Sequence, residues 1–523
     1  HEPGRNSTHL PQSGGALAPR EQELDQWLAG NADNPQQVLN RGQAETPPPE
    51  RRSFMGDVLK IVGGTSIAQL LIALATPLLT RLYLPEHFGT ANVFISLITV
   101  AGIAVCLRYE VAVLLPEQEE DSANLLGLAL SLAGLVSAFI LGLLAWGGAT
   151  LTGWLKAPEL QPHLLLVPLA LVAMGFYQAL NFWNMRQRRF WRLAGARLVM
   201  TGAQLTTQFA AAFLLRADAG GLILGTTLGY GVAALLLVGL TWRDDRALLR
   251  QVVRIRDMLA NLARYRKFPL VDAWALMIEA LSWQIPVWLL SAYFSQAVVG
   301  YYGMAYRLVQ LPIAFIGAAF SQVFMQRAAE FRQEPAQLQS TVGGVFSKLV
   351  ALSLFPAVLL SLAGKEIFII FLGANWAEAG MYVQIMGMWT FFWFLSGTLR
   401  TLTATLERQE LAFLFHGVTL VTRTAAFLAG CLLQDVYLAL WLSVGSGILV
   451  YGWISLTCLH LAGYPLRKAW KVIAGKAVWA IPAALLLGAA RLINDLPPWG
   501  MVALAALMML PYAWFVLRKE LQQ

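Results

Sequence analysis

The chain has 523 residues, of which 57% are hydrophobic and 13% charged, and its formal net charge is +8 at pH 7. A soluble domain carries about 25% charged residues, so this composition excludes an ordinary soluble protein. No basic patch is set into a soluble fold, which argues against nucleic acid as the partner of the positive charge.

The chain opens with a polar stretch, residues 1–57, that is rich in Pro, Gly and Gln. It lacks the charged start followed by an apolar core that defines a secretory signal. Because it holds too few apolar residues to form a core, we expect a disordered cytoplasmic tail.

Fourteen apolar stretches follow, and each is a predicted membrane span, since a helix needs about 20 apolar residues to cross the hydrocarbon. Open sheet edges cannot be satisfied in lipid, so the spans are expected to be helices and the protein an all-α polytopic membrane protein. The predicted spans are 58–80, 88–107, 124–147, 163–184, 195–215, 220–241, 268–292, 297–325, 343–363, 379–403, 411–432, 437–461, 477–491 and 498–517.

The basic residues between these spans fall almost entirely on alternate sides. With the amino terminus placed inside, 26 Lys and Arg lie in or beside the inner segments, and five in the outer ones. This bias predicts cytoplasmic amino and carboxyl termini, and it lets the basic faces contact anionic lipid headgroups. The five outer residues are Arg81, Lys156, Arg216, Lys365 and Arg491.

The spans divide into six, six and two. We expect an amino-terminal six-helix lobe at 58–241 and a second at 268–461, with an accessory helix pair and carboxyl terminus at 462–523. The connection 242–267 carries eight basic residues and an amphipathic pattern, so it is expected to lie in the membrane interface.

The two six-span halves start alike. Each has a proline in its first span, Pro77 or Pro286, and a glycine near the start of its second, Gly89 or Gly300. An even number of spans makes both halves start on the same side, so the repeats would be parallel. Transporters built this way hold substrate in a central cleft between the halves.

Three segments spread over both halves resemble a known family. They are residues 80–89 (TRLYLPEHFG), 108–116 (RYEVAVLLP) and 300–312 (GYYGMAYRLVQLP). These segments, and the layout of 58–461, resemble the Wzx-type polysaccharide and oligosaccharide flippases of the multidrug/oligosaccharidyl-lipid/polysaccharide exporter superfamily. The resemblance implies movement of a polyprenyl-diphosphate-linked oligosaccharide to the outer leaflet of a bacterial inner membrane, for surface polysaccharide biosynthesis. Implied partners are the lipid-linked oligosaccharide, membrane lipids, glycan polymerase and export machinery.

Ionisable residues inside the spans are the candidates for function, because inserting one costs roughly 2.5–3.5 kcal/mol on translocon scales. Glu279, Arg307 and Arg423 lie near mid-membrane. A second set lies in the cytoplasmic half of the spans and consists of Asp272, Arg400 and His416.

The spacing of these charges suggests a shared surface. Asp272 and Glu279 are seven residues apart, as are His416 and Arg423, so each pair shares a helix face. Three arginines against two carboxylates leave a net charge of +1 in the cleft, which fits a diphosphate because a guanidinium binds phosphate oxygens bidentately. The structural alternative is that Glu279 pairs with Arg307 or Arg423 and locks neighbouring helices together.

Two further arginines, Arg81 and Arg108, belong to the family-like segments and are additional substrate-binding candidates. Their position at span ends also suits arginines that reach toward headgroups. In the first half, amides of spans four and five and the ring of Trp183 are suitable for sugars, or for hydrogen bonds between helices.

Sequence motifs argue against several chemistries. No GxxxxGK[ST] loop is present, so no intrinsic ATP hydrolysis is expected. The three cysteines form no CxxC, and neither a metal nor another cofactor is expected. Energy would come from a proton or sodium gradient, with Glu279 and Asp272 as the ion-coupling or gating candidates, or from consumption of the product.

Two alternative functions remain open. A cation-coupled multidrug antiporter of the same superfamily should favour acidic and aromatic residues, against which the arginine excess argues. A membrane polymerase or ligase should carry a long outer loop with catalytic residues, whereas the outer segments 148–162 and 364–378 are short. We therefore expect a transporter rather than an enzyme.

Overall fold

The computed structural model describes residues 54–215, 217–313, 317–492, 497–512, 514 and 518. The chain divides at Leu59 into two units, and the second, residues 60–523, carries the fold. Across the described residues, every regular element is helical, which confirms the all-α prediction. The main helices are α3 (Phe54–Leu82), α4 (Pro85–Ala104), α5 (Tyr109–Ala112), α6 (Glu119–Trp154), α7 (Leu166–Arg186), α8 (Phe190–Leu214), α9 (Ala219–Val252), α10 (Ile255–Arg264), η2 (Phe268–Asp272), α11 (Ala273–Tyr293), α12 (Gln296–Pro312), α13 (Ala318–Glu330), α14 (Pro335–Leu372), α15 (Ala377–Leu399), α16 (Thr401–Thr405), α17 (Gln409–Leu432), α18 (Val436–Leu461), α19 (Leu466–Leu492) and α20 (Pro498–Tyr512).

Membrane crossing is supported by length and hydropathy. Ten of the described helices are long and apolar enough to span a bilayer, and each of the fourteen predicted spans overlaps one or two of the described helices. The most apolar window, in α6, is only 22% buried. Side chains such as Phe139 and Trp146 are therefore exposed on its surface, as expected of a helix whose solvent is lipid.

Several predicted boundaries were wrong. Helices α6, α14 and α19 extend well beyond the spans predicted for them, because an α-helix satisfies its own backbone and can continue past the apolar stretch. The predicted span 297–325 covers α12 and the first part of α13, and residues 314–316 between these helices lie outside the described part of the chain. Residues 54–57, expected in the tail, form the start of α3, and the rest of the predicted tail lies outside the described residues.

The amphipathic connection is also divided. Residues 242–252 continue α9, and only α10 is a separate helix. The break is held by Asn124 of α6, which donates to the Val252 carbonyl at 3.1 Å and accepts from the Arg254 amide at 2.9 Å. These two bonds satisfy backbone groups that the break would otherwise leave unpaired.

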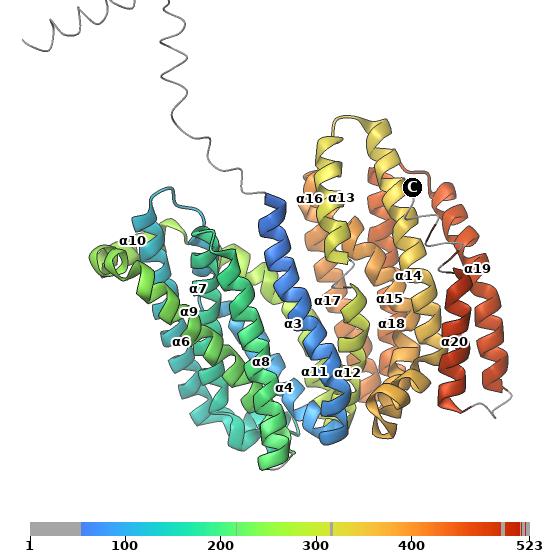
Figure 1. Ribbon diagram of the computed structural model, residues 1–523, viewed down its shortest axis with the longest axis horizontal. Helices are drawn as coiled ribbons and strands as arrows, with labels where there is room; N and C mark the ends of the chain where they lie inside the picture. Colours follow the sequence, from blue (N-terminus) through green and yellow to red (C-terminus); the bar gives the residue numbers. More distant parts are fainter. Residues whose placement is uncertain are drawn as a thin grey trace, which may run out of the picture. The chain divides into compact units, whose positions relative to one another are not determined.

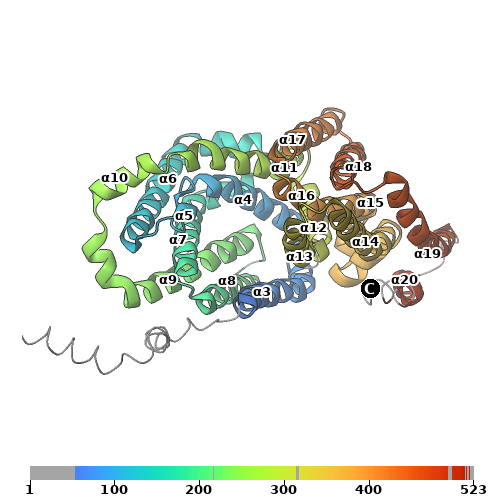
Figure 2. The ribbon, with the colours of Figure 1, turned by 90° about the horizontal axis from the view of Figure 1, so that it is seen from above.

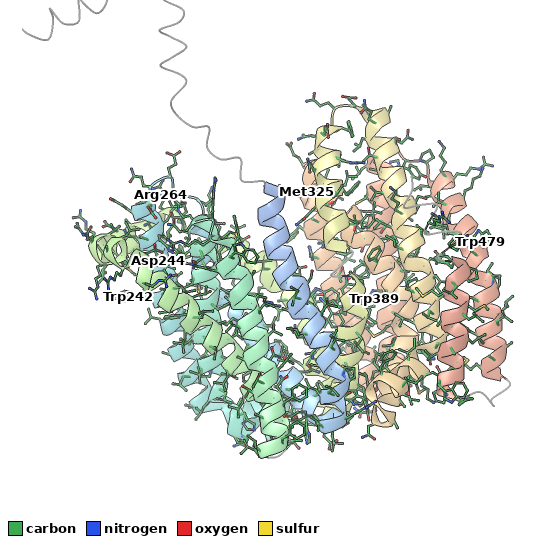
Figure 3. All side chains as sticks on the ribbon, in the orientation of Figure 1. Trp242, Asp244, Arg264, Met325, Trp389 and Trp479 are labelled. Atoms are coloured by element: carbon green, nitrogen blue, oxygen red, sulfur yellow. The ribbon has the colours of Figure 1, made fainter. Side chains whose placement is uncertain are left out.

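Helices α7, α8 and α9 pack against one another in the first half. Hydrogen bonds to Asp245 join these helices near one end, where Figure 3 labels the neighbouring residue Asp244. Asp245 accepts two bonds from the Arg189 guanidinium, at 2.6 and 2.7 Å, and one from the Trp183 indole at 2.8 Å. The ring of Trp183 is fully buried, so it packs in the structure rather than offering a face to sugars.

Helices α4 and α12, the second spans of the two halves, meet at the end where each begins; Figure 2 shows them from above. A Cβ added to Gly89 would lie 1.8 Å from the Gln296 carbonyl oxygen, and one added to Gly300 would lie 1.9 Å from that of Pro85. Each glycine thus contacts the first residue of the other helix. We call this reciprocal backbone contact the glycine contact.

The second half packs through α14 with α15, α15 with α18, and α17 with both α11 and α18. Helices α19 and α20 pack on α14, as the accessory pair seen in Figure 1. Both prolines of the predicted repeat, Pro77 and Pro286, lie inside helices α3 and α11.

The glycine contact generates a stability prediction. Gly89→Ala and Gly300→Ala should each lower the free energy of unfolding by about 1–3 kcal/mol, because the new methyl group overlaps backbone. Melting temperature in detergent, followed by fluorescence size-exclusion chromatography, measures the loss. Gly202→Ala is the matched control, since nothing lies within 4 Å of a Cβ added there. Equal melting temperatures for all three variants would contradict close helix packing.

The hydrogen bonds to Asp245 generate a second stability prediction. Asp245→Asn should destabilise the protein by about 1.5–3 kcal/mol, the range for hydrogen bonds to charged groups. Its neighbour Asp244 pairs with Arg192 and Arg243 at the surface, so Asp244→Asn should destabilise the protein less than Asp245→Asn does. Thermal unfolding of the two variants side by side checks the ranking, and the reverse order would refute it.

Candidate functional site

A cavity of about 410 Å³ lies among the helices of the second half. Its lining comes from α11, α12, α15, α17 and α18, with Arg400 from the α15–α16 junction and only Thr99 from the first half. Glu279, Arg400 and His416 are its charged or ionisable polar side chains, beside two tyrosines, Tyr306 and Tyr451. The sequence predicted a cleft between the halves, whereas this cavity is built almost wholly by one half.

One wall of the cavity is aromatic. The ring centroids of Trp283 and Trp393 are 5.1 Å apart, and Tyr306 stacks on Trp393 at 5.6 Å with an interplanar angle of 19°. Trp389, labelled in Figure 3, stacks behind Trp393 at 4.9 Å. Offset aromatic arrays of this kind are rigid, so the wall presents fixed ring faces to whatever enters.

Arg423 lies behind this wall rather than in the cavity. Its guanidinium donates to the carbonyl and hydroxyl oxygens of Ser282 and to the Tyr451 hydroxyl at 2.9 Å. Its Cζ is 3.8 Å from the Trp283 ring centroid, which is cation–π geometry. No carboxylate forms a salt bridge with Arg423 among the described residues, so its charge contributes a positive potential to the adjacent cavity.

Arg400 and His416 meet at the cavity edge. A guanidinium nitrogen of Arg400 contacts Nε2 of His416, and the Arg400 Cζ lies 5.2 Å from the Phe415 ring centroid. Glu279 lines the same cavity from α11. The structure therefore gathers Glu279, Arg400 and His416 around one space, with Arg423 next to it.

The other predicted site residues lie elsewhere. Arg307 is partly buried on α12 and does not line the 410 Å³ cavity. The next two residues, Leu308 and Val309, line a separate apolar recess of about 260 Å³ among α3, α12, α14 and α15. Arg81 is exposed in the last turn of α3.

Arg108 and Asp272 connect the two halves at the end opposite the glycine contact. Arg108 Nε donates to the Asp272 carboxylate at 2.9 Å, and its Nη1 donates to Glu110 at 3.0 Å. Arg108 adopts a left-handed conformation with φ 66°, which is costly for a non-glycine residue and turns the chain from α4 into α5. Burial raises the pKa of Glu110 even though Arg108 lies beside it.

Two of the amides predicted to face a sugar path make structural contacts. Asn184 donates to Leu180 and Thr241, and Gln208 donates to the Leu222 carbonyl. Thr241 and Leu222 belong to α9, so interhelical bonding, the alternative stated for these residues, accounts for these two amides. Within the described part of the chain, no three His, Cys, Asp or Glu residues are grouped in a way that could hold a metal ion.

Comparison with known structures shows what the fold is similar to. The fold matches a lipid II flippase, MurJ, in an inward closed conformation, with TM-score 0.67 and 11% identity over 89% of this chain and 99% of that one. It matches an inward-facing multidrug resistance MATE family transporter with TM-score 0.62 and 14% identity, over 79% and 98%. It also matches a MOP superfamily transporter from Pyrococcus furiosus with TM-score 0.51 and 14% identity, over 78% and 95%. The protein thus shares the fold of these transporters, and its long apolar helices make it a multi-pass membrane protein.

The sequence itself identifies the family. The family described as "Polysaccharide biosynthesis protein" matches residues 78–381, more than half of the chain. The chain belongs to this family, which confirms the resemblance drawn from its motifs. No match is found among curated proteins.

The Arg108–Asp272 pair generates a prediction about access. If the pair holds its end closed, Asp272→Asn should speed labelling of a Thr99→Cys reporter in the cavity by about two- to fivefold, the effect of breaking a partly exposed ion pair. A charged maleimide suits the measurement, because the native cysteines are buried. Glu410→Gln is the control, since its pair with Arg408 lies within one half. An unchanged rate would show that the pair is not a gate.

Proposed function

We propose that the protein is a flippase that moves a polyprenyl-diphosphate-linked oligosaccharide from the cytoplasmic to the outer leaflet of the bacterial inner membrane, for surface polysaccharide biosynthesis. The observation that carries the proposal is the cavity, in which Arg400 and a rigid aromatic wall line one space in a chain of the polysaccharide biosynthesis family.

The cavity matches both parts of such a head group. Arg400 offers a guanidinium fork to a diphosphate, and Arg423 adds positive potential from behind the wall. The faces of Trp283 and Trp393 offer flat apolar surface to sugar rings, while Gln284 and Gln310 offer amides to hydroxyls. The polyprenyl chain stays in the bilayer.

Movement follows from the two connections between the halves. We propose that six-helix lobes 58–241 and 268–461 rock about the glycine contact, with Arg108 and Asp272 separating to open the opposite end. Positive-inside bias supports placing that end, and both termini, in the cytoplasm. A proton or sodium gradient could drive the cycle through Glu279, which is the carboxylate lining the cavity.

A specific observation favours a second function. Glu279 and the aromatic wall together suit an organic cation, which binds to a carboxylate and to ring faces. Because Arg423 and Arg307 do not line the cavity, the predicted arginine excess is smaller there than the sequence indicated. A cation-coupled multidrug antiporter is therefore the alternative that the experiment must test.

The test uses vesicles reconstituted with the purified full chain and a fluorescent polyprenyl-diphosphate oligosaccharide. Wild type should flip the lipid, and Arg400→Gln should reduce the rate about 10- to 100-fold, the effect of one lost charge-assisted hydrogen bond. Arg408→Gln, an exposed arginine outside the cavity, is the control. Flipping unaffected by Arg400→Gln would remove this arginine from the site. Export of cationic dyes by a wild type that ignores the lipid would establish the antiporter instead.

A further inference from the structure

The contact between Arg400 and His416 constrains the proton on the histidine. A guanidinium carries only donors, so the Nε2 that it contacts must present a lone pair. His416 is therefore neutral in this arrangement, with its proton on Nδ1. A second proton would place an imidazolium directly against a guanidinium, and the contact could not persist.

Few charged groups near His416 would offset the positive charge of a protonated imidazole. Glu279 lines the same cavity from α11, and Arg400 lies beside His416 at the α15–α16 junction. From α12 and α18 come the tyrosines Tyr306 and Tyr451, and on its own helix Arg423 lies two turns further on. Cys458 of α18 is buried near Arg400. Among these groups, Glu279 is the one carboxylate.

We infer that His416 is a proton-binding site that controls the affinity of the cavity for the diphosphate head group. Neutral His416 holds Arg400 at the cavity edge. Protonation breaks that contact, frees the guanidinium fork for phosphate oxygens and adds a second cation to the lining. The inference rests on the proposed function, because it assigns the regulation of the same site.

The charge balance gives the direction of the effect. With His416 neutral, Glu279 and Arg400 cancel, so the charged lining attracts a dianion weakly. With His416 protonated, the lining is cationic and Arg400 has no competing acceptor at Nε2. Affinity for the diphosphate should therefore rise as the pH falls.

Binding measurements at pH 8.0, 7.0, 6.0 and 5.5 test this on the full chain in nanodiscs. The probe is undecaprenyl-diphosphate-linked N-acetylglucosamine, whose diphosphate is esterified at both ends and so keeps its charge over this range. Wild type should bind about tenfold more tightly at pH 5.5 than at pH 8.0, the size expected of one added charge-assisted hydrogen bond.

Three variants isolate the titrating group. His416→Gln keeps an acceptor for Arg400 but cannot be charged, so its affinity should be low and independent of pH. Glu279→Gln should bind more tightly throughout and keep the pH dependence. His460→Gln, an exposed histidine at the end of α18, should behave as wild type.

Each result has a defined meaning. A His416→Gln variant with wild-type pH dependence, or a wild type indifferent to pH, would overturn the inference while leaving the flippase intact. Loss of pH dependence in Glu279→Gln alone would assign the proton to that carboxylate and also overturn it. If wild type binds the probe at no pH although it elutes as a single folded species and melts cooperatively, the proposed function fails, and this inference fails with it.

Discussion

Hydrocarbon cannot hydrogen-bond, and most features of this structure follow from that constraint. Backbone groups must be satisfied within each segment, so the described elements are helices, and their apolar side chains face outward. Where the helical pattern is interrupted, a specific side chain takes over, as Asn124 does at the break between α9 and α10. Most polar side chains within the bundle are likewise tied to partners, as Asn184 is to Thr241 and Gln208 to the Leu222 carbonyl.

The cavity region brings together guanidinium groups whose burial would cost free energy if each lay there without partners. Arg423 is stabilised by two hydroxyls, a carbonyl and a tryptophan face rather than by a counter-ion. The guanidinium of Arg400 contacts the imidazole of His416 and lies over the ring of Phe415. Such arrangements keep a guanidinium charged yet leave it able to exchange partners. A tight ion pair with a carboxylate would make that exchange more difficult.

The fold could be predicted from the sequence to a large extent, because the bilayer dictates the length and polarity of every span. The ends of the helices could not be predicted, because α6, α14 and α19 continue past the apolar stretches from which hydropathy predicts a span. For the site, the rule that charges in spans are functional selected Glu279 and Arg400, which do line the cavity. The same rule could not show that Arg423 lies behind the aromatic wall or that Arg307 lies outside the cavity. Residue spacing shows which side chains share a helix face, but it does not show what that face packs against. The aromatic wall was missed since tryptophans in spans are hard to distinguish from interfacial belts.

The two connections between the halves differ in their physical nature. At one end, backbone contacts backbone through Gly89 and Gly300; at the other, partly exposed charges meet between Arg108 and Asp272. Van der Waals contact between glycines is insensitive to ionic strength, whereas exposed ion pairs weaken as salt screens them. Dissolved salt should therefore weaken the contact between Arg108 and Asp272 while leaving the glycine contact unchanged. In the proposed rocking motion, the resting balance between conformations would then depend on the ionic composition of the compartment that bathes Arg108.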